Sequence, residues 1–114
     1  MKIKLRKASL SDAEILWKMQ KAAFAPLYEI YRDEGSPAME PLSRTQERLE
    51  QSETSYYFIL ADGAPAGAIR VRDWQSERPK VISPLFVLPD FQGRGIAQRA
   101  IRRAEELHGS HDAK

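Results

Sequence analysis

A glycine-containing stretch near the C-terminal end of the chain has the residue types best suited to chemistry. It reads Gln92-Gly93-Arg94-Gly95-Ile96-Ala97 and follows an apolar segment, Leu85-Phe86-Val87, and a turn marked by Pro89. The pattern predicts a strand, a loop and a helix that runs to about Leu107. The first amides of a helix lack carbonyl partners and carry the positive end of the helix dipole. The stretch is therefore a candidate cradle for phosphate oxygens.

Two glycines have a plainer explanation as well, because Gly93 and Gly95 could serve only as turn residues with positive φ. The stretch is not a Walker A loop, which needs a lysine followed by a hydroxyl residue. It also departs from the dinucleotide fingerprint, since residue 98 is glutamine where that pattern has glycine or alanine. The loop either binds phosphate in another way or is a simple turn.

Metal and thiol chemistry are not expected. His108, His111 and Asp112 lie in a polar tail and have no evident fourth ligand. The chain has no cysteine, so it lacks disulfides, thiolate nucleophiles and cysteine-based zinc sites, and it fits a cytoplasmic location.

The composition suits one soluble globular domain, with 114 residues, 42% hydrophobic and 30% charged. We expect this domain over residues 1–107, followed by a polar tail at 108–114 that frays. A net charge of +2 gives no reason to expect a nucleic-acid partner. No apolar run reaches the roughly 20 residues that span a bilayer, so no membrane partner is expected.

The elements before the loop follow an α/β order. Alternation at residues 3–6 predicts a short strand, and the helix after it should kink or end at Pro26. A polar helix is expected at 43–51. The first helix has two possible capping boxes, Ser9 with Asp12 and Ser11 with Glu14.

Three strands are expected between these helices and the loop. Asp62-Gly63 is a hairpin turn signal between strands at 56–61 and 66–72. The third strand, at 80–87, contains Pro84, which cannot donate to a ladder. We therefore expect a bulge or an edge position there.

The stretch Gln92–Ala97 resembles the Gln/Arg-x-x-Gly-x-Gly/Ala signature of the GCN5-related N-acetyltransferase (GNAT) superfamily. The lead-in at 85–91, the opening at 3–13 and the Asp62-Gly63 hairpin resemble that family too. The resemblance implies a three-layer α/β/α fold around a mixed, mostly antiparallel sheet. It also implies an N-acetyltransferase that moves an acetyl group from acetyl-CoA to a primary amine by direct transfer, without a metal.

The resemblance assigns the cofactor contacts as well. Main-chain groups of Leu85, Phe86 and Val87 would meet the pantetheine arm of acetyl-CoA. The pyrophosphate would sit on the loop amides, which belong to Gln92, Gly93, Arg94, Gly95, Ile96 and Ala97. The two glycines would let the backbone approach the phosphates without a Cβ in the way.

No catalytic base carries over from the family, so only candidates can be named. Asp73 and Glu77 could face the acceptor amine, or could be surface turn carboxylates. Tyr28 and Tyr31 could shape the acceptor site, or could pack with one polar end exposed. Trp74 could wall an acceptor pocket or cover a core edge. An acidic segment could attract a cationic acceptor or be simply solvated; its members are Glu29, Asp33, Glu34 and Glu40.

The chain departs from the family after the signature helix, where members continue with a further strand, a helix and a closing hairpin. Only residues 109–114 follow here, and the tyrosine that can protonate the leaving thiolate has no counterpart. We expect an open strand edge that pairs with a second copy in a homodimer, or a homodimer in which the two copies exchange elements. The alternative to an enzyme is a catalytically incompetent module that binds CoA or forms an assembly.

Overall fold

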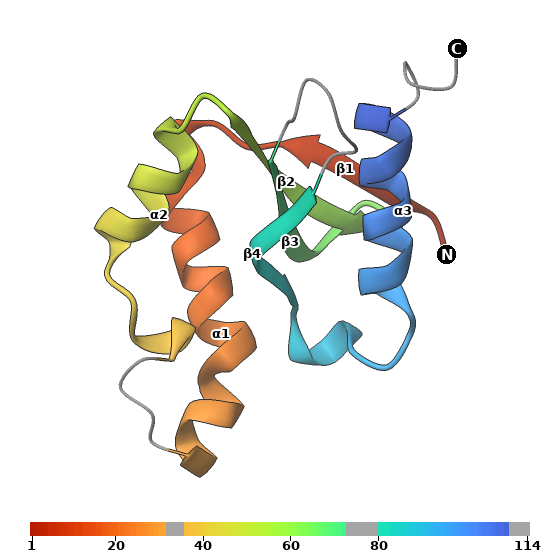
Figure 1. The fold of residues 1–114 in the computed structure, drawn as a ribbon. Helices are drawn as coiled ribbons and strands as arrows, with labels where there is room; N and C mark the ends of the chain where they lie inside the picture. The colour runs from red at the N-terminus through yellow and green to blue at the C-terminus, as the bar shows by residue number, and fades with distance from the viewer. Residues whose placement is uncertain (32–35, 73–79, 110–114) are drawn as a thin grey trace.

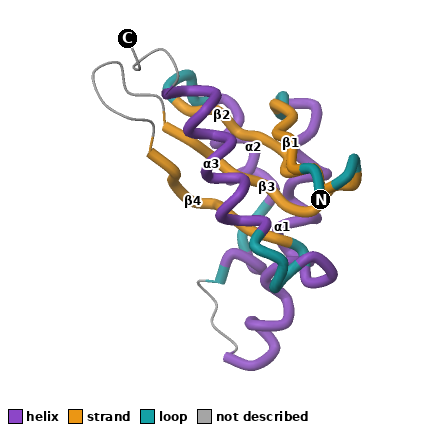
Figure 2. Tube along the Cα trace, turned by 90° about the vertical axis from the view of Figure 1, so that its right-hand side faces the viewer, coloured by secondary structure: helices purple, strands orange, loops and turns teal. Residues whose placement is uncertain are grey.

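The computed structural model describes residues 1–31, 36–72 and 80–109, which form three layers (Figure 1). A four-stranded sheet in the order β1-β2-β3-β4 is the central layer. Helices α1 and α2 cover one face of the sheet, and α3 covers the other (Figures 1 and 2). The expected three-layer α/β fold is confirmed. The elements are β1 (Ile3–Lys7), α1 (Ala13–Tyr31), α2 (Leu42–Glu50), β2 (Thr54–Ala61), β3 (Ala64–Arg72), β4 (Lys80–Val87) and α3 (Ile96–Gly109).

All three described strand pairings of the sheet are antiparallel. Side chains along a strand point alternately to the two hydrophobic cores, one on each face of the sheet. On β2, Tyr56 and Phe58 pack toward α1, whereas Tyr57 and Ile59 belong to the core under α3. Side chains at successive strand positions point to opposite faces, so one strand serves both layers. The hairpin turn at Asp62-Gly63 is confirmed, with φ angles of 51° and 87°.

The sequence left two points open for the first helix, namely which capping box forms and whether Pro26 ends the helix. Of the two capping boxes, the Ser9 alternative is formed, at a 3₁₀ turn (Leu10–Asp12) that leads into α1: the Asp12 carboxylate accepts the Ser9 amide at 2.9 Å. Helix α1 then runs through Pro26 as one element to Tyr31, so the expectation that Pro26 could end it was wrong.

Strand β4 is distorted at Pro84, as the sequence predicted. Ile69 of β3 pairs with Leu85, but the next residue, Arg70, pairs with Ile82. Residues 83 and 84 therefore fall between two registers and form a bulge. Among the described strands, β4 is also an edge of the sheet.

The C-terminal end of β4, at Phe86 and Val87, lies unusually close to the backbone of β3 at Gly67. A Cβ on Gly67 would lie 2.1 Å from the carbonyl oxygen of Phe86 and 3.0 Å from the Cα of Val87. Only glycine permits this approach, because backbone atoms cannot move aside as a flexible side chain can. The contact fixes the end of β4 against β3, just before the glycine-containing loop.

Candidate functional site

The connection from β4 to α3 is a short, ordered loop. A 3₁₀ turn at Pro89–Phe91 follows β4, and the Phe91 amide donates to the Leu88 carbonyl at 2.9 Å. Gly93 and Gly95 then have φ angles of 79° and 73°. Other residues rarely adopt these angles, so both glycines are required by the backbone path into α3.

The backbone amides at the start of α3 have no hydrogen-bond partners among the residues that the structure describes. Within the described residues, the backbone N–H groups from Gly93 to Gln98 make no hydrogen bond, and the first to do so is that of Arg99, to the Gly95 carbonyl at 3.2 Å. Residues of this stretch also line a cavity of about 410 Å³, together with Val87, Phe91 and Gln92. An added Cβ at Gly93 or Gly95 would meet no atom within 4 Å. Open space bordered by unpartnered amides fits an anionic group such as pyrophosphate.

Beside this cavity, the main-chain groups of successive β4 residues point alternately toward β3 and toward the open edge of the sheet. Phe86 turns its carbonyl toward Gly67 of β3, and the Leu88 amide donates to the Ala66 carbonyl at 2.7 Å. In an antiparallel pair, the residues between such positions direct their main-chain groups away from the partner strand. Leu85 and Val87 therefore face the open edge, where the Val87 carbonyl accepts the Gln92 side-chain amide at 2.9 Å.

The structure brings together most of the residues that sequence reasoning assigned to the cofactor. Phe86 is the exception, because its carbonyl faces β3 and its side chain is buried against Phe24, with ring centroids 6.1 Å apart. Ile96 is buried in the core under α3, so only its backbone can face a ligand. Arg94 is exposed, with its guanidinium carbon 5.9 Å from the centre of the Phe91 ring. The cavity is lined by Val87, Phe91, Gln92, Gly93, Gly95, Ile96, Ala97 and Gln98.

The catalytic candidates are mostly outside the described part of the chain. Asp73, Glu77 and Trp74 lie there entirely, and so does the side chain of Tyr31. Tyr28 is half-buried in the last two turns of α1. The catalytic roles of these residues stay predictions, and the geometry assigns no general base.

Glu40 belongs to a buried polar cluster that sequence reasoning missed. Its carboxylate accepts both terminal nitrogens of Arg48, at 2.8 and 3.0 Å, and the side-chain amide of Gln20 at 2.7 Å. The hydrogen bonds from the Arg48 guanidinium hold the pKa of Glu40 below its usual range, although burial opposes this. The cluster ties α1 to α2, so Glu40 is not available to attract a cationic acceptor. The signal is not visible in the sequence, because Glu40 and Arg48 lie in different elements.

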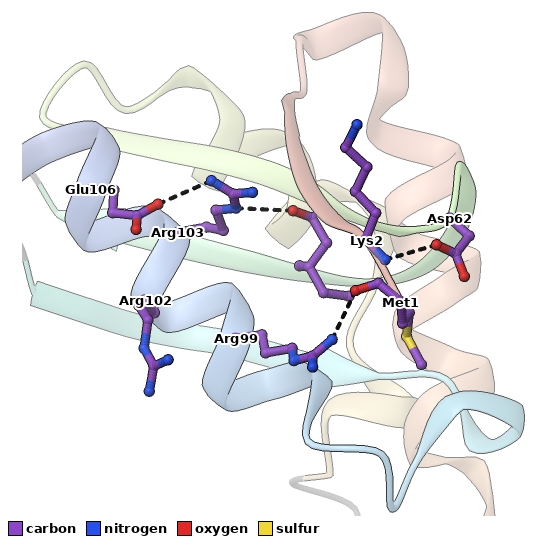
Figure 3. Close-up of a pocket in the computed structure, with 8 residues that line it drawn as sticks. Met1, Lys2, Asp62, Arg99, Arg102, Arg103 and Glu106 are labelled. Carbon is purple, nitrogen blue, oxygen red and sulfur yellow. Dashed lines mark hydrogen bonds and ion pairs between the residues drawn. The ribbon is translucent and has the colours of Figure 1, made fainter.

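A larger cavity, of about 680 Å³, lies between α3 and the N-terminal segment (Figure 3). Arg99 donates to the Met1 carbonyl at 2.8 Å, and Arg103 donates to the Ile3 carbonyl at 3.1 Å. Arg103 is also paired with Glu106 at 3.1 Å. These bonds fasten α3 to the N-terminal segment, which gives Arg99 and Arg103 a structural role.

Two other kinds of feature are absent from the described residues. They contain no group of three or more His, Cys, Asp or Glu side chains placed to hold a metal ion. Across the same residues, none of the helices has the length and apolar character needed to cross a membrane.

A family profile described as the acetyltransferase (GNAT) family matches residues 17–114. No curated protein matches the chain. Solved structures do. The chain is similar to an acetyltransferase from Thermus thermophilus, with a TM-score of 0.70 and 19% identity, covering 90% of this chain and 67% of that one.

Two more solved structures share the fold. One is the PaiA N-acetyltransferase of Thermoplasma acidophilum in complex with coenzyme A, with a TM-score of 0.61 and 21% identity, covering 98% of this chain and 75% of that one. The other is an aminoglycoside acetyltransferase from an uncultured soil metagenomic sample, in complex with sisomicin. Its TM-score is 0.62 and its identity 15%, covering 96% of this chain and 71% of that one.

Proposed function

Because the chain belongs to the acetyltransferase (GNAT) family, whose enzymes use acetyl-CoA, we propose that it transfers an acetyl group from acetyl-CoA to a primary amine by direct transfer. The observation that carries the proposal is the run of amides from Gly93 to Gln98, which have no partner in the described part of the chain and lie beside an open cavity. Such an arrangement at a helix start favours a phosphate-bearing ligand over a neutral one.

The proposed role of each residue in acetyl-CoA binding follows from the direction in which its main-chain N–H and C=O groups point. Amides of the loop 92–97 hold the pyrophosphate, and Arg94 adds positive charge at its rim. The Gln92 amide is the weakest contributor, because it already donates to the Pro89 carbonyl at 3.3 Å. Leu85 and Val87 bind the pantetheine arm through the open edge of β4. Phe86 supports them by packing under the strand.

Transfer needs few groups from the protein. The amine nitrogen attacks the thioester carbonyl carbon, a C–N bond forms and the C–S bond breaks. The proton lost by the amine goes to a base, and the leaving thiolate takes up a proton to become the thiol. Exposed amides at the edge of β4 are available to stabilise the negative charge that develops on the carbonyl oxygen. For the base and the acceptor site, the candidates remain Asp73, Glu77, Tyr28 and Tyr31.

Calorimetry with acetyl-CoA tests the proposed cofactor, with ATP as the comparison ligand. We expect saturable binding of acetyl-CoA that is tighter than binding of ATP. A thiol-release assay over a panel of primary amines then tests transfer. Binding of acetyl-CoA without thiol release for any amine would reduce the proposal to a CoA-binding module, and tighter binding of ATP would contradict it.

The open edge of β4 supports a second proposal, a homodimer in which two copies pair along the part of this edge before the bulge at residues 83–84, which leaves Leu85 and Val87 to the pantetheine arm. Val81, Leu85 and Val87 give β4 an apolar, half-buried face, and an unpaired apolar edge favours association. Light scattering should give twice the chain mass of 13.0 kDa. The mass of a single chain at all concentrations would contradict it. The cysteine-free sequence supports a cytoplasmic location for this dimer.

A further inference from the structure

Strand β1 is the second edge of the described sheet, because the strand order β1-β2-β3-β4 gives it a neighbour on one side only. The unpaired main-chain N–H and C=O groups of such an edge can pair with a strand of another chain. The open edge of β4 already supports the proposed homodimer. The state of the β1 edge therefore decides whether this domain can add strands at one edge or at both.

The hydrogen bonds of β1 show which of its main-chain groups point away from β2. The Asp62 amide donates to the Lys2 carbonyl at 2.8 Å, and the Ala8 amide donates to the Tyr56 carbonyl at 2.8 Å. Both even-numbered residues therefore face β2 and its hairpin turn, and the direction alternates along an antiparallel strand. The main-chain groups at the open edge belong to the odd-numbered residues, Met1, Ile3, Leu5 and Lys7.

Two arginines of α3 occupy the first carbonyls of this edge. Arg99 donates to the Met1 carbonyl at 2.8 Å, and Arg103 donates to the Ile3 carbonyl at 3.1 Å (Figure 3). A further strand would lie about 4.7–4.9 Å from β1 and would direct its own amides to the same carbonyls. The guanidinium groups that already bond these oxygens therefore stand where the backbone of a further strand would have to lie.

The spacing of the two arginines matches the spacing of the two carbonyls. Arg99 and Arg103 are four residues apart on α3, which corresponds to a rise of about 6 Å. Met1 and Ile3 are two residues apart in an extended segment, which corresponds to about 6.8 Å. The next residue at this helical spacing, Leu107, lines a cavity together with residues of β1. One face of α3 thus follows the edge of β1.

Charge also disfavours pairing at this edge. Arg103 is paired with Glu106 at 3.1 Å, which helps to hold its guanidinium beside β1. Four more cations along the edge have exposed side chains, namely Lys2, Lys4, Arg6 and Lys7. Like charges on neighbouring strands destabilise a sheet, so two β1 strands would repel each other.

We propose that Arg99 and Arg103 close the β1 edge to strand pairing, so that a strand of a second copy can add at β4 but not at β1. The inference goes beyond acetyl transfer and does not depend on it. A sheet that is open at both edges can add copies head to tail into an open chain, whereas pairing of one edge with its own copy ends at a two-fold dimer. The arginines therefore limit the size of the assembly.

The test is the double variant Arg99→Met/Arg103→Met, which keeps the length of both side chains but removes the donors. Sedimentation equilibrium measures the weight-average mass over a wide range of protein concentration. The wild type should keep the mass of one chain or of the β4 dimer. The double variant should rise with concentration to at least twice the mass of the wild type. A double variant with the wild-type mass at every concentration would overturn the proposal.

The matched control is Arg44→Met/Arg102→Met. It removes the same two positive charges from exposed positions, and neither arginine bonds a carbonyl of the β1 edge in the described part of the chain. The control should keep the wild-type mass. If it associates as strongly as the first double variant, the lost charge explains the effect and the proposal fails.

Hydrogen exchange and a proline then locate the contact. Association through β1 should slow the exchange of the amides of Ile3, Leu5 and Lys7. Adding Lys7→Pro to the double variant removes an N–H that faces the edge and leaves the β1–β2 bonds intact, so it should restore the wild-type mass. Association that survives Lys7→Pro without slower exchange in β1 would contradict the proposal. If the double variant unfolds, Arg103→Met alone frees the Ile3 carbonyl and takes the same tests.

Discussion

Replacing Gly95 by alanine should weaken acetyl-CoA binding at least tenfold. The residue has a φ of 73°, where an alanine costs roughly 1–2 kcal/mol. The loop can relieve this strain only by turning its backbone, and that turns the amides at the start of α3 away from the pyrophosphate. A tenfold loss corresponds to about 1.4 kcal/mol of binding free energy. Isothermal titration calorimetry measures it directly.

Gly63→Ala is the matched control for this variant. Gly63 also has a positive φ, 87°, and its added Cβ would also meet no atom within 4 Å. It lies at the tip of the hairpin between β2 and β3, outside the loop. Both variants should lower the free energy of unfolding by a similar amount, while only Gly95→Ala loses affinity. Unchanged acetyl-CoA affinity in Gly95→Ala would show that the loop amides do not bind the pyrophosphate.

The loop was predictable from sequence because its determinants are local. Two glycines, a proline-marked turn and the start of a helix are close together in the chain, and each has its own conformational preference. The bulge at Pro84 was predictable for the same reason, since proline removes a ladder donor wherever it stands.

The polar cluster under α2 was not predictable, because its contacts join distant segments. Glu40 meets Gln20, twenty residues earlier, and Arg48 in the following helix. In the sequence, Glu40 counted only as one member of an acidic run. Phe86 shows the same limit of prediction from sequence. The sequence indicated that Phe86 lies in a strand, but the direction of its carbonyl depends on the register between β4 and β3 at Gly67. Register and long-range pairing are set by packing, which a local pattern does not contain.

Replacing Glu40 by glutamine should lower the free energy of unfolding by about 2–4 kcal/mol at neutral pH. The Arg48 side chain is only 13% exposed and would lose the charged group that balances it. Glutamine keeps one oxygen for Arg48 or Gln20 but cannot accept from both Arg48 nitrogens with a negative charge. Chemical denaturation measures the change. Glu47→Gln is the control, since its pair with Arg44 is exposed, and it should change stability by no more than about 0.5 kcal/mol.

The effect of Glu40→Gln should depend on pH with a definite sign. Arg48 holds the pKa of Glu40 low in the folded protein, so the stabilisation is present above the pKa of a glutamate in the unfolded chain. It is lost as pH falls through the lower pKa of the folded state. The difference in unfolding free energy between wild type and Glu40→Gln should therefore be constant near neutrality and shrink below about pH 4.3. A difference that keeps its neutral value at pH 3, while wild type is still folded, would show that the charge of Glu40 does not stabilise the cluster.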